Sequence, residues 1–135
     1  RSEVLSVATR RGLTEITPAV RAAVRAAGVA EGLCTLFVRH TSASLVIQEN
    51  ADRSVQRDLE AFLSRLVPDG DPLFTHVEEG DDDMSAHVKA ALLKTSEQVP
   101  VAGGELLLGT WQGIYVWEHR TGSRRRQVVV HVAGE

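Results

Sequence analysis

The stretch that decides the fold is His40-Thr41-Ser42-Ala43-Ser44-Leu45-Val46-Ile47-Gln48-Glu49-Asn50. It follows an apolar run and leads into a segment with helical periodicity. Its centre is apolar, but it also carries an imidazole, several hydroxyls, a carboxylate and an amide. Buried polar groups cost free energy unless they have partners. So many of them beside a core indicate a polar site, and we expect this stretch to form one wall of it.

The composition is typical of a single globular domain. The chain has 135 residues, of which 43% are hydrophobic, and this is enough to build a packed core. A net charge of −3 gives no overall basic field for nucleic acid or anionic membrane. No apolar run is long enough to span a bilayer, and the first residues lack a signal-peptide pattern. Together with the single Cys34, these features predict a cytoplasmic protein that binds neither nucleic acid nor membrane.

Hydrophobic periodicity predicts strands and helices in one domain, residues 1–135. Strands are expected over 4–9, 33–40, 44–49, 105–110, 113–119 and 125–133, and the last three are expected to form an antiparallel meander. A first helix is expected to begin with Thr17 as N-cap and to end at Gly28. Further helices are expected over 52–66 and from Met84 to Leu92. Residues 10–13 are expected to form a turn, and 68–83 a long connection of the kind that is often functional.

Four ionisable side chains stand at the ends of apolar strand rows. Alternate residues of a strand share one face, so each of the four is in phase with buried neighbours. They are His40 (row 34–38), Glu49 (45–47), Glu118 (114–116) and Arg126 (128–132). Buried charges need partners, metals or ligands, so the four together predict a lined pocket. The alternatives are strand-end side chains that reach water, or an internal Glu–Arg pair.

Three histidines adjoin the elements of this predicted pocket. His40 ends a strand, His76 lies in the long connection, and His87 borders the inward face of the helix after it. Three imidazoles that converge from separate elements suit Zn²⁺ or a similar ion with an open coordination position. Their spacing matches no short metal motif, so the hypothesis rests on convergence. The sequence contains no phosphate loop, dinucleotide-binding glycine motif or nucleophile elbow.

In order and spacing, these residues resemble the YjbQ family, also called the secondary thiamine-phosphate synthase family. The resemblance runs from residue 4 to 132. The positions that carry it are His40-Thr41-Ser42-Ala43, Glu49-Asn50, Asp58, His76, Glu79-Gly80, Met84, His87, Gly109-Thr110-Trp111-Gln112, Glu118 and Arg125-Arg126. Two positions depart from the family pattern: Asp83 stands where Asn is expected, and Ser85 where Pro is common. Both flank His87, so the departures concern the geometry of the loop around it.

The resemblance implies an α+β fold with a sandwich-like, mostly antiparallel sheet arrangement and about three helices. It also implies a homotrimer. Family members are described as having a weak or secondary thiamine-phosphate synthase activity. That reaction joins hydroxymethylpyrimidine diphosphate to thiazole phosphate and releases pyrophosphate. The expected cofactor is a divalent metal, Zn²⁺ or Mg²⁺, bound by histidines.

We therefore assign roles to the pocket residues as a hypothesis. His40, His76 and His87 would surround a metal or phosphate, and Arg126 would bind phosphate. Glu49, Asp58 and Glu118 would orient the imidazoles or bind the metal. Asn50 and Gln112 would recognise the heterocycle. The same pocket would also suit a metal-dependent hydrolase of a phosphorylated small molecule. A third alternative is a non-enzymatic trimer that binds a metal or a small ligand.

Overall fold

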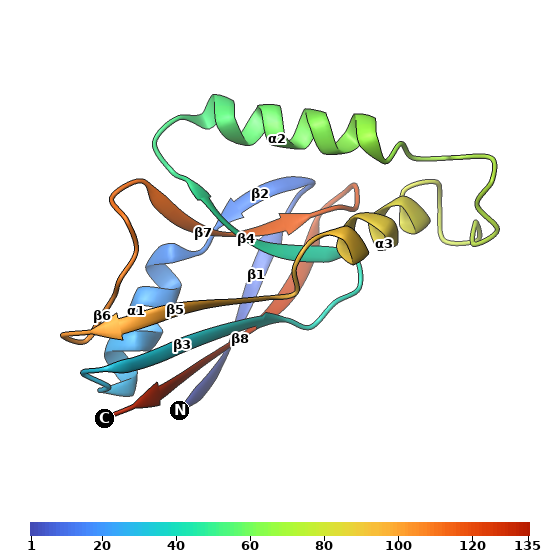
Figure 1. Ribbon diagram of the computed structural model, residues 1–135. Helices are drawn as coiled ribbons and strands as arrows, with labels where there is room; N and C mark the ends of the chain where they lie inside the picture. Colours follow the sequence, from blue (N-terminus) through green and yellow to red (C-terminus); the bar gives the residue numbers. More distant parts are fainter.

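Alternation of apolar residues produces eight strands, which pair into two antiparallel sheets (Figure 1). The structure is a computed structural model that describes residues 1–135. Sheet A has the order β1 (Ser2–Thr9), β8 (Arg124–Gly134), β3 (Gly32–Val38), β5 (Ser96–Ala102) and β6 (Glu105–Leu106). Sheet B has the order β2 (Gly12–Glu15), β7 (Gln112–Glu118) and β4 (Ala43–Glu49). The predicted α+β fold with a sandwich-like antiparallel arrangement is confirmed.

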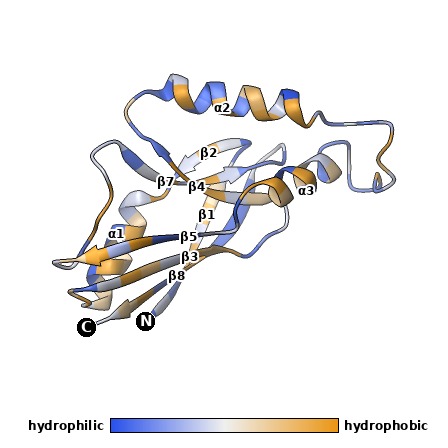
Figure 2. Ribbon diagram, in the orientation of Figure 1, coloured by the Kyte–Doolittle hydropathy of each residue, from blue (hydrophilic) through white to orange (hydrophobic).

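Three helices complete the fold: α1 (Thr17–Ala27), α2 (Arg53–Leu66) and α3 (Asp83–Leu92). Gly28 ends α1 in the left-handed conformation, with φ 67°, as predicted from its position after the apolar stripe. The Asp52 side chain accepts the amide of Ser54 and so caps α2. α2 lies over the outer face of sheet B, where hydrophilic and hydrophobic segments alternate along its length (Figures 1 and 2). None of the three helices has the length and apolar character needed to span a bilayer.

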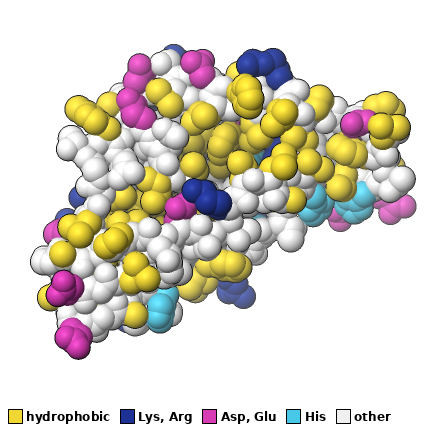
Figure 3. All heavy atoms as spheres, in the orientation of Figure 1, with side chains coloured by type: hydrophobic (Ala, Val, Ile, Leu, Met, Phe, Trp, Pro, Cys, Tyr) yellow, Lys and Arg dark blue, Asp and Glu magenta, His cyan; other side chains and the backbone are white.

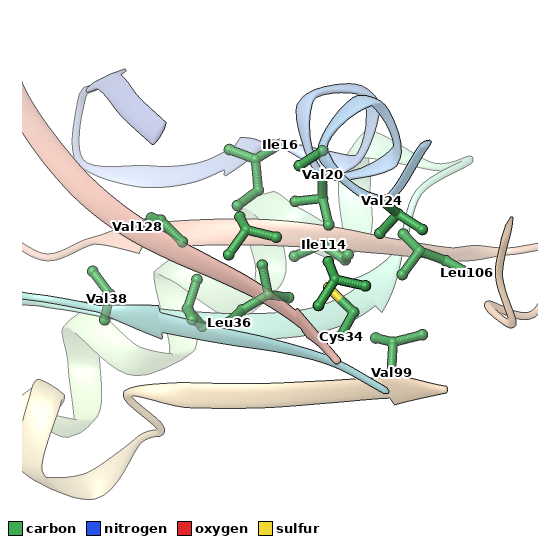
Figure 4. Close-up of a cluster of buried hydrophobic side chains, with 14 of the residues drawn as sticks. Ile16, Val20, Val24, Cys34, Leu36, Val38, Val99, Leu106, Ile114 and Val128 are labelled. Carbon is green, nitrogen blue, oxygen red and sulfur yellow. The ribbon is translucent and has the colours of Figure 1, made fainter. Parts of the chain in front are cut away.

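The core fills the space between the two sheets and is closed by α1 (Figure 4). The row Cys34–Leu36–Val38 and the row Val128–Val130–Val132 form the inner face of sheet A, each residue at most 2% exposed. Leu45, Ile114 and Val116 face them from sheet B, and Val20 and Val24 from α1. The predicted inward rows are therefore confirmed. Burial of such side chains is worth roughly 1.5–3 kcal/mol each, so these rows fix which polar strand ends lie at the rim of the core.

The pairing of the C-terminal strands differs from the predicted meander. β7 pairs with β2 and β4, whereas β8 pairs with β1 and β3, so consecutive strands enter different sheets. The strand predicted for 105–110 is only Glu105–Leu106. Conversely, residues 12–15 were predicted to lie at and after a turn, but they form β2, because the edge of β7 offers them backbone partners.

Thr17 was predicted as the N-cap of α1, and this is wrong. Ile16 occupies that position. The Thr17 hydroxyl instead accepts the amide of Ile114 at 2.8 Å and donates to the Glu15 carboxylate at 2.8 Å. Its side chain therefore joins the start of α1 to β7, a tertiary role that local sequence does not reveal.

Candidate metal centre

Three side chains converge where the long connection meets α3. His76 Nε2 lies 2.7 Å from Asp83 Oδ2, and His87 Nε2 lies 3.3 Å from the same oxygen. The two imidazole rings are 5.5 Å apart, and one ligand atom from each of the three residues lies within 4.8 Å of the others. Asp83 and His87 are four residues apart on α3, so they share a face. Two imidazoles and a carboxylate form a ligand set that binds transition metals.

The backbone of the 40–50 stretch, at Thr41, fixes the orientation of His87. Its Nδ1 lies 3.2 Å from the carbonyl oxygen of Thr41. A carbonyl only accepts, so Nδ1 carries the hydrogen, and in a neutral ring Nε2 then presents a lone pair. This lone pair faces the carboxylate oxygen of Asp83, an arrangement that favours a proton or a cation between them. Metal-binding histidines usually have such a carbonyl partner on the other ring nitrogen, so these residues fit a metal ion.

Asp83 is held in place by Arg120. The Asp83 side chain is 4% exposed, and its Oδ1 lies 3.3 Å from Arg120 Nη1. Burial alone would raise the pKa of Asp83, but the hydrogen bond with His76 and the charges of His87 and Arg120 lower it below its usual value. Arg120 also contacts the Asp82 carboxylate and the carbonyl of Glu79. It therefore fastens the long connection to the start of α3 and keeps an ionised carboxylate between the two imidazoles.

The structure brings together His76 and His87, but not His40. The Nε2 atom of His40 accepts the backbone amide of Gln127 at 2.9 Å, so that nitrogen is already occupied. Asp83 takes the third position of the cluster. Sequence reasoning missed it because the Asp81–Asp83 run had a sufficient explanation as a helix N-terminus. Its spacing of four residues before His87 was the signal that could have identified it.

Four further predicted site residues lie away from the cluster. Glu49 accepts the amides of Ala51 and Asp52, and Gln112 accepts the amide of Gly109. Asn50 donates to the carbonyl of Gln112, whereas Asp58 is exposed on α2. The prediction that His40 and Glu49 face one cavity is wrong, because they lie at opposite ends of β4, roughly 20 Å apart at the usual rise per residue. Glu49, Asn50 and Gln112 shape the turns at the far end of sheet B.

The remaining two predicted residues, Glu118 and Arg126, pair with each other. Arg126 Nε and Nη2 each donate to one Glu118 oxygen at 2.6 Å. Glu118 is fully buried and Arg126 is 8% exposed. Thr9 and the amide of Arg120 complete the bonds to the carboxylate. Burial would raise the pKa of Glu118, but the bonds from Arg126 and Thr9 lower it. The internal Glu–Arg pair that the strand phase left open is therefore what forms.

The fold defines a class of small α+β proteins built from two antiparallel sheets and three helices. The family model described as "UPF0047 protein YjbQ-like" matches residues 3–135. A UPF0047 protein of Synechocystis is 52% identical over 98% of this chain and 91% of its own. The YjbQ protein of Escherichia coli O157:H7 is 44% identical over 77% of this chain and 75% of its own. The chain belongs to the YjbQ-like UPF0047 family.

Solved structures share the whole fold. A protein of the yjbq/upf0047 family from Clostridium acetobutylicum has a TM-score of 0.84 and 37% identity, covering 96% of this chain and 99% of that one. A hypothetical protein of Aeropyrum pernix has a TM-score of 0.86 and 29% identity, covering 98% of this chain and 99% of that one. The arrangement of two sheets and three helices is therefore the common fold of this family.

The ion pair gives a direct test of the packing. Glu118→Ala leaves the Arg126 charge buried without a partner, so we expect it to lower the free energy of unfolding by about 3–5 kcal/mol. The double variant Glu118→Leu/Arg126→Met removes both charges. Its free energy of unfolding should fall clearly less than that of Glu118→Ala. Urea denaturation followed by circular dichroism measures both. Glu105→Ala, which removes an exposed ion pair with Arg25, is the control. It should change the free energy of unfolding little. If Glu118→Ala and the double variant lowered the free energy of unfolding equally, the result would contradict a stabilising ion pair.

Proposed function

We propose that the chain binds a divalent transition-metal ion at His76, Asp83 and His87, and that it acts with this ion on a phosphorylated small molecule. The observation that carries the proposal is the convergence of two imidazole nitrogens on one buried carboxylate oxygen. Two nitrogen ligands favour Zn²⁺ over Mg²⁺, which prefers an all-oxygen environment. Three protein ligands leave a coordination position for substrate or water. Such an ion, when bound, stabilises the negative charge of a departing phosphate or diphosphate.

The proposed reaction is a weak or secondary thiamine-phosphate synthase activity. The diphosphate would leave hydroxymethylpyrimidine diphosphate, and the nitrogen of thiazole phosphate would attack the exposed methylene carbon. This chemistry needs charge stabilisation and positioning more than proton transfer. It agrees with the absence of a hydroxyl–imidazole–carboxylate relay among the residues around the cluster. Support for the substrates comes from the family resemblance, and support for the charge stabilisation comes from the cluster.

A metal-dependent hydrolase is the second candidate. Two histidines, one carboxylate and an open position form the ligand set of several catalytic zinc hydrolases. In that case water, instead of the thiazole, would attack the phosphorylated substrate. The metal cluster is common to both reactions, so the acceptor distinguishes them.

Metal binding is tested on the purified protein. After removal of metal with a chelator, we expect Zn²⁺ to bind with one ion per chain in isothermal titration calorimetry. His76→Ala and His87→Ala should weaken binding at least about tenfold, since each removes a ligand. His40→Ala should leave the affinity close to that of the parent, and so should His131→Ala, a control on the exposed face of β8. Unchanged affinity in both ligand variants would contradict the assignment.

The reaction is tested by incubating the metal-loaded protein with both thiamine precursors. We expect thiamine phosphate and pyrophosphate to form together, and His87→Ala and chelator each to reduce the rate at least about a hundredfold. Release of phosphate that does not need the thiazole would identify the hydrolase instead. Saturable binding of a precursor without turnover would leave only the ligand-binding alternative. Chromatographic detection of thiamine phosphate and a colorimetric phosphate assay separate these results.

We also propose that the protein is a homotrimer. Large apolar side chains are exposed on opposite sides of the sandwich: Phe62 and Leu66 on α2 are 60% and 59% exposed, and Val4 and Leu33 on sheet A are 51% and 37% exposed. Figure 3 shows the hydrophobic side chains on the surface of α2. Two different faces that bind each other form a head-to-tail interface, and such an interface gives a closed ring when the rotation between neighbouring subunits closes. Exposed apolar area of this kind commonly marks an interface.

Light scattering after gel filtration tests the assembly. We expect a mass three times the 14.7 kDa of one chain. Phe62→Lys should shift the protein toward the mass of a single chain, because it places a charge in the apolar contact. Glu31→Lys, an exposed position outside both faces, is the matched control and should keep the trimer mass. A parent protein with the mass of one chain would contradict the assembly.

A further inference from the structure

One end of the buried guanidinium of Arg126 has no acceptor. Its Nε and Nη2 donate to Glu118, and Nη2 also donates to the hydroxyl of Ser42 at 2.8 Å. The only neighbour of Nη1 within hydrogen-bond range is His40 Nδ1, at 3.5 Å. Arg126 as a whole is 8% exposed. Its Nη1 points out of the ion pair toward His40.

His40 does not provide an acceptor for this donor. Its Nε2 lies 2.9 Å from the backbone amide of Gln127, and an amide can only donate. Nε2 must therefore hold the lone pair, and in the neutral ring Nδ1 carries the hydrogen. Burial, followed by the charge of Arg126, lowers the pKa of His40, which favours this neutral form. His40 Nδ1–H and Arg126 Nη1–H are thus two donors that face each other without an acceptor.

His40, one of the two residues that carry these donors, adjoins a cavity of about 420 Å³. The cavity is lined by Phe37, Val38, Arg39, His40, Thr41 and Thr95. Arg39 adds a second cation with no carboxylate partner among the protein's ion pairs. Phe37 adds an aromatic side chain that is 47% exposed. The backbone of Thr41 joins the cavity to the cluster, because its carbonyl accepts the hydrogen bond from His87.

We propose that this cavity is a phosphate subsite, in which a phosphate oxygen of the substrate accepts hydrogen bonds from both His40 Nδ1–H and Arg126 Nη1–H. Arg39 binds a second oxygen of the same group or of a diphosphate, since guanidinium groups bind phosphate strongly. Phe37 offers its face to an aromatic or heteroaromatic ring. The substrate class is therefore an aromatic phosphate or diphosphate. The identity of the substrate rests on the proposed function, but binding of the anion does not require the metal.

The test is binding of inorganic pyrophosphate and inorganic phosphate to the full chain in excess chelator, measured by isothermal titration calorimetry. We expect both anions to bind, and pyrophosphate more tightly. His40→Phe removes one donor, and Arg126→Lys keeps a cation for Glu118 but removes the Nη1 donor. Each should weaken pyrophosphate binding at least about tenfold, and Arg39→Ala about threefold or more. Arg125→Ala, an exposed neighbour that contacts Ser6, is the matched control and should bind as the parent does.

A second measurement does not depend on the variants folding well. Long-range proton–nitrogen spectra of the parent protein should assign His40 as the Nδ1–H tautomer, and added pyrophosphate should shift its Nδ1 resonance. A His40 with its hydrogen on Nε2 would overturn the proposal. So would absence of pyrophosphate binding in chelator, or equal binding by His40→Phe. If pyrophosphate binds as expected while Zn²⁺ does not, the phosphate subsite stands and the proposed metal function fails.

Discussion

The buried ion pair of Glu118 and Arg126 holds the two sheets together at the end of the sandwich that bears the candidate site. Glu118 ends β7 of sheet B, and Arg126 belongs to β8 of sheet A. The connection between these strands therefore crosses from one sheet to the other, and the pair closes it with a contact of 2.6 Å. Two buried charges are tolerated only when their hydrogen bonds are satisfied. Thr9, Ser42 and the amide of Arg120 satisfy most of them, so β1 and the segment before β4 are fixed by the same pair.

Both halves of the proposed site follow from this constraint. On one side, the connection between β7 and β8 places Arg120 against Asp82 and Asp83, and so sets the Asp83 carboxylate between His76 and His87. On the other side, the pair leaves one end of Arg126 directed at His40. Thr41 connects the two halves, since its carbonyl orients His87 while its neighbour His40 lines the cavity. A metal ion and a phosphate group would then be held side by side, as transfer or hydrolysis of a phosphorylated substrate requires.

The two ends of the 40–50 stretch have different roles. Its first residues, His40 and Thr41, adjoin the cluster and the cavity. Its last residues, Glu49 and Asn50, close a turn at the opposite end of β4. Strand phase identified both as ends of apolar rows, because phase reports which face a residue occupies. Phase does not report which end of the sheet a residue lies at, and that is why the two were grouped wrongly.

The sequence by itself determined the inward rows, the extent of α2, the Gly28 stop and the family, because these depend on local periodicity and on residues close in the chain. Only the tertiary structure decided which side chains contact each other and which strands pair. Asp83 replaced His40 beside His76 and His87 because side-chain direction on α3 brought it there. β7 and β8 separated into different sheets because each had two other strands to pair with. Whether Glu118 and Arg126 met each other or a ligand depended on a distance across the core, and no local pattern encodes that distance.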